Sequence, residues 1–272
     1  MATISVEHGP ITTVTLNRPD VRNAFNEALI DELTAWAKSV VPGETRVAIL
    51  QGAGKAFCAG ADVQWMAKMV GYSRDENFAD AKRAAEMLNA LDRVPVPLIG
   101  RVHGAALGGG SGLASVCDVV VAADDALFGF TEVVLGIIPA MISPYVVRKI
   151  GINNARELCL SGTRFDAARA KAVGLANEVV PAAELDAAVD RHVQLFLKAA
   201  PSAVARAKAL LRQVHGRLPE DVIDLTSAAI AEQRVSPEGQ EGLRAFLEKR
   251  QPAWVAGTEA PAPTRSGAER KS

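Results

Sequence analysis

Apolar positions follow two different periods along the first half of the chain. The segments Thr3–Val6 and Ile11–Leu16 are rich in β-branched residues and flank a Gly-Pro turn, which predicts a β-hairpin. Helical spacing follows Asn26, a residue suited to cap a helix, and that apolar stripe consists of Leu29, Leu33, Trp36, Ala37 and Val40. The same patterns predict further strands at Val47–Leu50, Leu98–Val102, Val119–Ala122 and Leu127–Phe130, and helices at Val63–Met69, Arg74–Leu91 and Ser111–Val116. Because strands alternate with helices, we expect an α/β fold with parallel strands joined by crossovers.

The second half of the chain has mostly helical spacing. One helix carries apolar residues between Ala203 and Val214, and another begins at Ser236-Pro237, a capping residue followed by proline at the first helical position. From about Gly257 the sequence is rich in Ala, Pro, Gly and charge, which is typical of a flexible tail. We therefore expect a core over residues 1–200, a helical region over 201–256 and a tail over 257–272.

Composition narrows the class of protein. The chain has 272 residues, 49% of them hydrophobic and 22% charged, so it needs no disulfide or metal to fold. Its net charge of -1 provides no general field for nucleic acid or an anionic membrane. Three separated cysteines and four scattered histidines do not form a disulfide framework or a metal motif. Since no signal peptide or membrane span is recognisable, we expect a cytoplasmic protein without a bound metal.

Two segments share a strand, a loop of small residues and a helix start. They are Val47–Asp62 and Leu98–Gly112. The first N–H groups of a helix have no partner within the helix, so two such ends could together hold one oxygen that gains negative charge. The candidate donors are the N–H groups of Ala61 and Gly109. Taken alone, the glycines fit ordinary tight turns equally well, and the spacing matches neither a dinucleotide fingerprint nor a phosphate-binding P-loop.

Several motifs together resemble the crotonase (enoyl-CoA hydratase/isomerase) family. In chain order they are Asn17-Arg18-Pro19, Lys55–Asp62, His103–Gly110, Cys117-Asp118, Phe128–Pro139 and Glu241–Arg250. They occur in the family's order and spacing, and the match spans roughly residues 3 to 254. The resemblance implies a crotonase-like superhelix of ββα units, followed by a helical trimerisation region that forms a homotrimer or a dimer of trimers.

The resemblance also implies an acyl-CoA thioester substrate, with no metal or redox cofactor because CoA is part of the substrate. Ala61 and Gly109 then match the family's oxyanion hole. The CoA contacts are expected at Arg22, Ala24, Ala59 and Asp62, and, from a neighbouring subunit, at Phe246 and Lys249. For these residues the sequence leaves simpler roles open, such as a loop arginine for Arg22 and a helix cap for Asp62.

The chain departs from the family at one catalytic position. Two-carboxylate hydratases carry a glutamate where this chain has Gly112, whereas the second glutamate is present as Glu132. Glu132 lies among apolar neighbours, which favours burial and a raised pKa. Water could be held by Ser111, by another side chain or by the substrate; otherwise Glu132 acts alone, as in one-glutamate isomerases of the family.

The segment after Glu132 refines the hypothesis. Together with Gly112, Ile137–Tyr145 resembles bacterial methylglutaconyl-CoA and carboxylated-isoprenyl-CoA hydratases. The leading hypothesis is therefore an enoyl-CoA hydratase acting on a branched or carboxylated acyl group. The alternatives are a double-bond isomerase and a non-catalytic relative that binds acyl-CoA or RNA, although the basic run over 206–217 favours a solvated helix face. A nucleophilic triad of Ser111, His103 and Asp118 is disfavoured because Ser111 does not lie in a GxSxG motif.

Overall fold

The computed structural model describes residues 2–256, and its framework is a six-stranded sheet. Only the first two strands pair antiparallel, and they form the predicted hairpin; the other pairs are parallel. The strand order is β1-β2-β3-β4-β6-β9, made of β1 (Ile4–Glu7), β2 (Ile11–Leu16), β3 (Val47–Gly52), β4 (Leu98–Val102), β6 (Val119–Ala123) and β9 (Glu178–Val180). Strands rich in Val, Ile and Ala that are buried on both faces suit parallel pairing.

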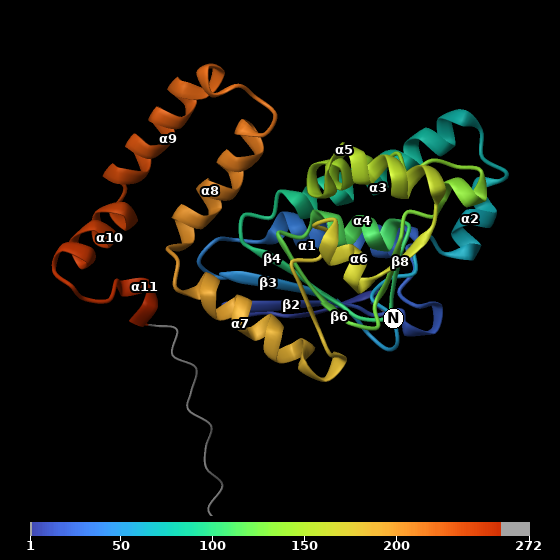
Figure 1. Ribbon diagram of the computed structural model, residues 1–272, viewed down its shortest axis with the longest axis horizontal. Coiled ribbons are helices and arrows are strands. Elements are labelled where there is room, and N and C mark those ends of the chain that lie inside the picture. Colours follow the sequence, from blue (N-terminus) through green and yellow to red (C-terminus); the bar gives the residue numbers. More distant parts are fainter. Residues whose placement is uncertain (1, 257–272) are drawn as a thin grey trace, which may run out of the picture.

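Helices cover both faces of this sheet, as Figure 1 shows. One face carries the main hydrophobic core beneath α1 (Glu27–Ser39), α3 (Arg74–Asp92), α4 (Gly109–Val116) and α5 (Ser143–Ser161). The opposite face is covered by α7 (Leu185–Leu197), which buries a second, smaller apolar cluster. The expected caps are confirmed: Asn26 accepts a hydrogen bond from the N–H of Leu29 at 3.0 Å, and Ser236 accepts one from Gly239 at 3.0 Å.

A second sheet lies next to the first and places the segment that contains Glu132. It has three strands in the order β5-β7-β8, with β5 (Ala105–Leu107), β7 (Leu127–Gly129) and β8 (Arg164–Asp166), and is followed by α6 (Ala167–Ala172). The expectation of a plain glycine loop before α4 was incomplete, because residues 105–107 pair with β7 as a strand. The rings of Phe128 and Phe165 stack at 6.0 Å between centroids and anchor the end of β7.

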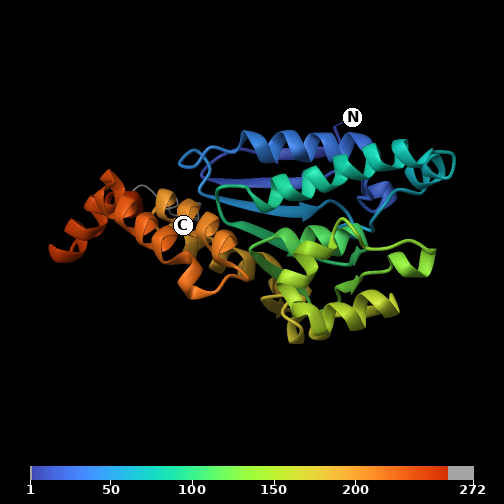
Figure 2. The ribbon, with the colours of Figure 1, turned by 90° about the horizontal axis from the view of Figure 1, so that it is seen from above.

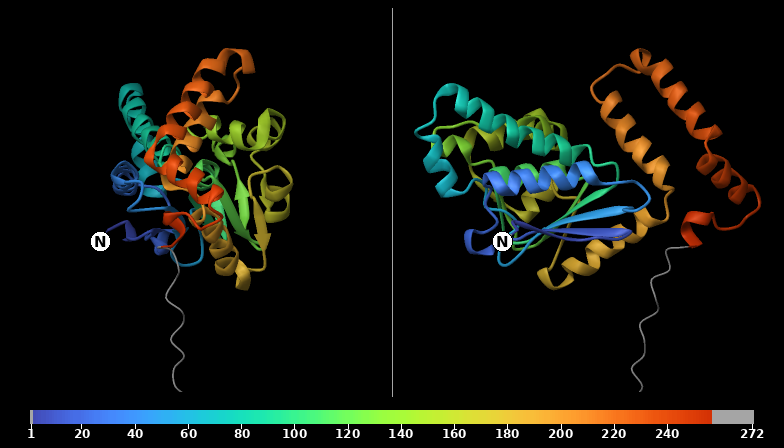
Figure 3. Two further views of the ribbon diagram at one scale, coloured as in Figure 1. Left: turned by 90° about the vertical axis from the view of Figure 1, so that its left-hand side faces the viewer. Right: turned by 180° about the vertical axis from the view of Figure 1, so that it is seen from behind.

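The last helices form an arm that extends away from the core (Figure 2). The arm consists of α8 (Pro201–Val214), α9 (Ile223–Val235), α10 (Pro237–Leu247) and α11 (Ala253–Ala256), and Figure 3 shows it from two further sides. The smaller elements are α2 (Val63–Met69), η1 (Pro19–Val21), η2 (Glu132–Leu135), η3 (Ala182–Glu184) and η4 (Pro219–Val222). None of the helices in residues 2–256 combines the length and apolar character needed to span a membrane. The expected tail over 257–272 lies outside the described residues.

Basic residues attach the arm to the core. Lys208 forms an ion pair with Asp118 at 2.6 Å and donates to the carbonyl of Val96, and Arg212 donates to the carbonyl of Asp92. Arg46 donates to the carbonyls of Leu197 and Ala199, just before the arm begins, and to that of Trp254 in α11. The expectation of a solvated basic face on α8 was therefore wrong for Lys208 and Arg212, because the tertiary structure uses these side chains against the core.

Candidate active site

The two glycine-containing loops lie side by side. The N–H of Cys58 donates to the carbonyl of Ala105, and the N–H of Leu107 donates back to Cys58, both at 3.0 Å. This close pairing requires glycine: a Cβ on Gly110 would lie 2.0 Å from the carbonyl oxygen of Cys58. The small residues seen in the sequence are therefore explained first by contact between the two main chains.

Ala61 and Gly109 line one cavity, as the oxyanion hypothesis requires. Ala61 directly precedes the cap of α2, and Gly109 is the first residue of α4. A Cβ on Gly60 would lie 3.7 Å from the Gly109 nitrogen, so the two segments are in contact at this point. Neither the Ala61 nor the Gly109 N–H donates a hydrogen bond to another residue within 2–256. Both groups are therefore available to a ligand oxygen.

Phe25 connects the two segments, a role that no motif in the sequence indicates. Its main chain accepts from the N–H of Asp62 at 2.8 Å and donates to Gly60 at 2.7 Å. Its ring is so close to Gly109 that a Cβ there would lie 2.4 Å from a ring carbon. Phe25 thus fixes the main chain around Ala61 and packs against Gly109 at the same time.

Glu132 faces the same cavity from η2. Its Oε1 lies 3.4 Å from the position that a Cβ on Gly108 would take, immediately before Gly109. Its Oε2 is buried and has no hydrogen-bond partner. Burial raises the pKa of Glu132, because the ionised carboxylate is poorly solvated there; a hydrogen bond from its own main chain opposes the shift. A half-buried carboxyl that lines a cavity, with one unpartnered oxygen and a raised pKa, is suited to exchange a proton with a ligand.

The cavity around Glu132 is about 200 Å³ and mostly apolar. Glu132 is the one ionisable side chain among the described residues that line it. Four of the five methionines of the chain belong to its wall, a feature that the sequence pattern does not single out. Methionine packs adaptably around irregular apolar shapes. The apolar wall includes Phe25, Trp65, Met66, Met69, Met87, Leu88, Leu135, Ile137, Ile138, Met141 and Ile142.

Ser111 does not face this cavity, so the structure contradicts a role for it in holding water. Its hydroxyl is fully buried, donates to the carbonyl of Ala106 at 2.6 Å and accepts from the N–H of Gly129 at 3.1 Å. The hydroxyl proton is therefore already used, and the side chain connects α4 to β5 and β7, two of the three strands of the smaller sheet. Gly112 is also buried, and Ile142 occupies the space next to it: a Cβ on Gly112 would lie 2.2 Å from Cγ2 of Ile142.

The residues expected to contact CoA fall into two groups. Arg22, Ala24, Ala59 and Asp62 lie close together along the first loop, where the carbonyl of the exposed Arg22 accepts from the N–H of Ala59 at 2.9 Å. Phe246 and Lys249 instead belong to the arm, which Figure 1 shows far from α2. Phe246 is 82% exposed and does not line the cavity within one chain.

Asp62 has a structural role that its sequence position also predicted. Its carboxylate caps α2 by accepting from Gln64 at 2.7 Å and forms an ion pair with Arg18 at 2.7 Å. Burial alone would raise the pKa of Asp62, but the hydrogen bonds from Arg18 and from the helix N–H groups outweigh it and lower that pKa. This carboxylate therefore positions the loop that carries Ala61.

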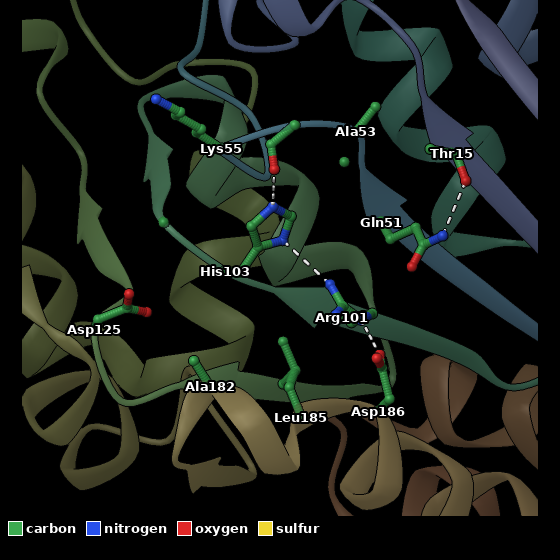
Figure 4. A pocket seen from close by; sticks show the side chains of 13 residues that line it. Thr15, Gln51, Ala53, Lys55, Arg101, His103, Asp125, Ala182, Leu185 and Asp186 are labelled. Carbon is green, nitrogen blue, oxygen red and sulfur yellow. Dashed lines mark hydrogen bonds and ion pairs between the residues drawn. The ribbon is translucent and has the colours of Figure 1, made fainter.

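His103 lies in a separate, open groove that Figure 4 shows from close by. One ring nitrogen contacts the carbonyl of Gly54 at 2.9 Å, and the other contacts Arg101, which is paired with Asp186. Asp118, by contrast, is bound to Lys208 and to the N–H of Leu98. Ser111, His103 and Asp118 thus have different partners and do not form a nucleophilic triad. The described residues also contain no cluster of three or more His, Cys, Asp or Glu that could hold a metal.

Comparison with known proteins agrees with this geometry. The family model described as enoyl-CoA hydratase/isomerase matches residues 7–257. The chain is 34% identical to the 2,3-dehydroadipyl-CoA hydratase of Escherichia coli over 89% of this chain and 94% of that protein. It is 32% identical to the enoyl-CoA isomerase/hydratase fer4 of Mycosarcoma maydis, covering 92% of this chain and 94% of the other.

Solved structures share the whole architecture. The crystal structure of an enoyl-CoA hydratase from Shewanella pealeana has a TM-score of 0.87 and 38% identity, covering 93% of this chain and 96% of that one. The expected crotonase fold, with its helix-rich C-terminal part, is thereby confirmed. The chain, with its two adjoining loops and its half-buried glutamate, belongs to the enoyl-CoA hydratase/isomerase family.

Proposed function

We propose that this protein is an enoyl-CoA hydratase in which Glu132 is the single acid–base residue. The thioester carbonyl oxygen accepts hydrogen bonds from the N–H groups of Ala61 and Gly109. These bonds draw electron density from the double bond and stabilise the enolate that forms when water adds. The observation that carries the proposal is the half-buried carboxyl of Glu132, whose Oε2 has no hydrogen-bond partner, in the wall of the cavity that Ala61 and Gly109 also line.

One carboxylate can perform both proton transfers. Ionised Glu132 takes a proton from water as the water oxygen bonds to the β-carbon, and then returns that proton to the α-carbon as the enolate collapses. The net change is the addition of one water, and the glutamate ends in the ionised state in which it began. This cycle needs no metal or redox cofactor, and in the reverse direction Glu132 removes the α-proton.

The volume and the lining of the cavity indicate which acyl groups would fit. A volume of about 200 Å³ corresponds to roughly seven water-sized groups, enough for a short branched chain. The wall supports the branched hydrocarbon part of the sequence-based hypothesis. An additional carboxylate, as in methylglutaconyl-CoA, would meet Glu132 and no cation among the described lining residues. Such a substrate would need its cation from a second copy of the chain.

The experiment is a product assay with purified protein and a panel of 2-enoyl-CoA esters. The panel contains straight, 3-methyl-branched and carboxylated acyl groups, with 3-methylcrotonyl-CoA and 3-methylglutaconyl-CoA as a pair that differs by one carboxylate. We expect loss of the enoyl absorbance and a product heavier by one water, with the branched hydrocarbon preferred. If no ester in the panel gains water, hydration is not the activity.

Isomerisation is the second candidate, because Ile142 makes the region opposite Gly112 apolar and isomerisation requires only one base. In this reaction Glu132 moves a proton between two carbons and the product keeps the mass of the substrate. Supplying 3-enoyl-CoA esters to the same assay separates the two activities, since a shifted double bond without added water identifies an isomerase.

We also propose that the arm joins copies of the chain into a homotrimer or a dimer of trimers. The support is a group of exposed apolar side chains on the arm: Leu211, Ile230, Leu243, Phe246 and Leu247. Exposed apolar patches of this kind mark interaction surfaces. In such an assembly Phe246 and Lys249 would reach the nucleotide end of a neighbour's CoA. Light scattering of the purified protein measures the molar mass, and a monomer would contradict this proposal.

A further inference from the structure

Gly112 and the catalytic region lie on one face of α4. The N–H of Gly112 donates to the carbonyl of Gly108 at 3.0 Å, so the two glycines are one helical turn apart. Side chains on a helix lean toward the preceding turn. A side chain at position 112 would therefore extend over Gly108, where Oε1 of Glu132 lies. The residue at position 112 therefore influences which side chains or water molecules can lie next to Glu132.

Ile142 occupies that space. A Cβ at position 112 would lie 2.2 Å from Cγ2 and 3.0 Å from Cβ of Ile142. Ile142 cannot easily give way, because a β-branched side chain has few allowed rotamers and this one is only 3% exposed. Its main-chain carbonyl also accepts from the N–H groups of Tyr145 and Val146, each at 3.0 Å, at the start of α5. Gly112 and Ile142 are thus a complementary pair.

We infer that Ile142 is a specificity-determining residue for the proposed reaction. By filling the space beside Gly112 while lining the cavity, its apolar side chain leaves the carboxyl of Glu132 and the neighbouring hydroxyl of Thr131 as the polar partners for water among the described lining residues. It thereby restricts how much water can reach the β-carbon of a 2-enoyl ester before Glu132 takes a proton from the γ-carbon and returns it to the α-carbon, the transfer that gives the isomerised product. Ile142 sets the ratio of hydrated to isomerised product, and this inference rests on the proposed function.

The first experiment measures that ratio in Ile142→Ala. Removing the branched side chain opens apolar space next to Glu132, and we expect the ratio of hydrated to isomerised product to rise about tenfold, the scale of effect of a missing methylene or two in a binding pocket. Ile152→Ala is the matched control, since Ile152 lies on α5 but is 61% exposed. An unchanged ratio in Ile142→Ala, with turnover retained, would overturn the inference.

The second experiment tests the contact without using activity. Gly112→Ala alone should lower Tm by several degrees, because its Cβ overlaps Ile142. In the double variant Gly112→Ala/Ile142→Ala that overlap is gone, so the combined loss should be clearly smaller than the sum of the single losses. Additive losses would refute the pairing. If the protein neither hydrates nor isomerises any ester, the proposed function is contradicted. The Tm values of the single and double variants would still decide whether Gly112 and Ile142 are in contact.

Discussion

The core and the arm of this protein use amphipathic helices in opposite ways. In the core, α1 buries Leu29, Ile30, Leu33, Trp36 and Ala37 against the sheet. In the arm, α8 and α9 bury no residue, and α10 buries only Ala245. The apolar stripe of α8 is nevertheless as regular in the sequence as that of α1. The difference teaches that an apolar stripe predicts a helix but does not tell which surface will cover it.

The same contrast separates the parts of the proposed site. The oxyanion donors and Glu132 come from the core and meet within one chain, whereas Phe246 and Lys249 come from the arm and do not. If the chemistry depends on the core and CoA binding depends on the arm, changes in the core should affect the chemical step and changes in the arm should affect the affinity for CoA.

The largest effect is expected in the core. Glu132→Gln removes the only ionisable side chain in the described cavity wall, so kcat should fall by at least about a hundredfold. Steady-state kinetics on the best ester of the panel gives the measurement. Light scattering should show an unchanged molar mass, because the arm is untouched. Turnover close to that of the unaltered protein would remove Glu132 from the mechanism.

An intermediate effect is expected in the arm. Phe246→Ala should raise KM for an acyl-CoA about tenfold and change kcat by less than about twofold, since the proposed contact of the ring with a neighbour's nucleotide is lost and about 1.4 kcal/mol of binding free energy corresponds to a tenfold change in affinity. The matched control is Phe78→Ala, which removes another exposed ring, on α3.

A truncated substrate sharpens this test. The acyl-pantetheine thioester lacks the nucleotide, so Phe246→Ala should leave its KM unchanged. An equal increase in KM for both substrates would mean that Phe246 acts through the fold or the assembly and not through the nucleotide.

The smallest effect is expected in the stability of the core. Burial raises the pKa of Glu132 in the folded state, so its contribution to stability is complete below the pKa of an unfolded glutamate, about 4.3, and is lost as the pH rises through the folded value. Glu132→Gln avoids this loss and should have a Tm a few degrees higher at pH 7. Thermal denaturation at pH 4 and pH 7 measures the difference, which should vanish at pH 4.

The control for this measurement is Glu184→Gln, a change at an exposed site. A Tm gain for Glu132→Gln that is the same at both pH values would show that the negative charge of Glu132 does not destabilise the folded protein.

The sequence by itself determined the local elements and the motif positions. Asn26, Asp62 and Ser236 cap the helices that their spacing predicted, because a cap depends on residues only two or three positions away. The order of strands and small-residue loops likewise indicated the α/β class and the place of Ala61 and Gly109, whereas the crotonase-like superhelix and the role of Glu132 came from the resemblance to the family.

Only the tertiary structure decided what lies next to these residues. Segments far apart in the chain meet where Phe25 packs on Gly109, where Ile142 packs on Gly112 and in the cavity wall that contains the methionines. The sequence does not show which apolar residues will be in contact, because apolar packing has no specific pairing rule. The hydroxyl of Ser111 was a candidate for binding water until the fold placed it between two main-chain groups. Lys208 and Arg212 similarly changed from an expected solvated face to anchors of the arm, because a charge can be solvated or paired and only its neighbours in space determine which.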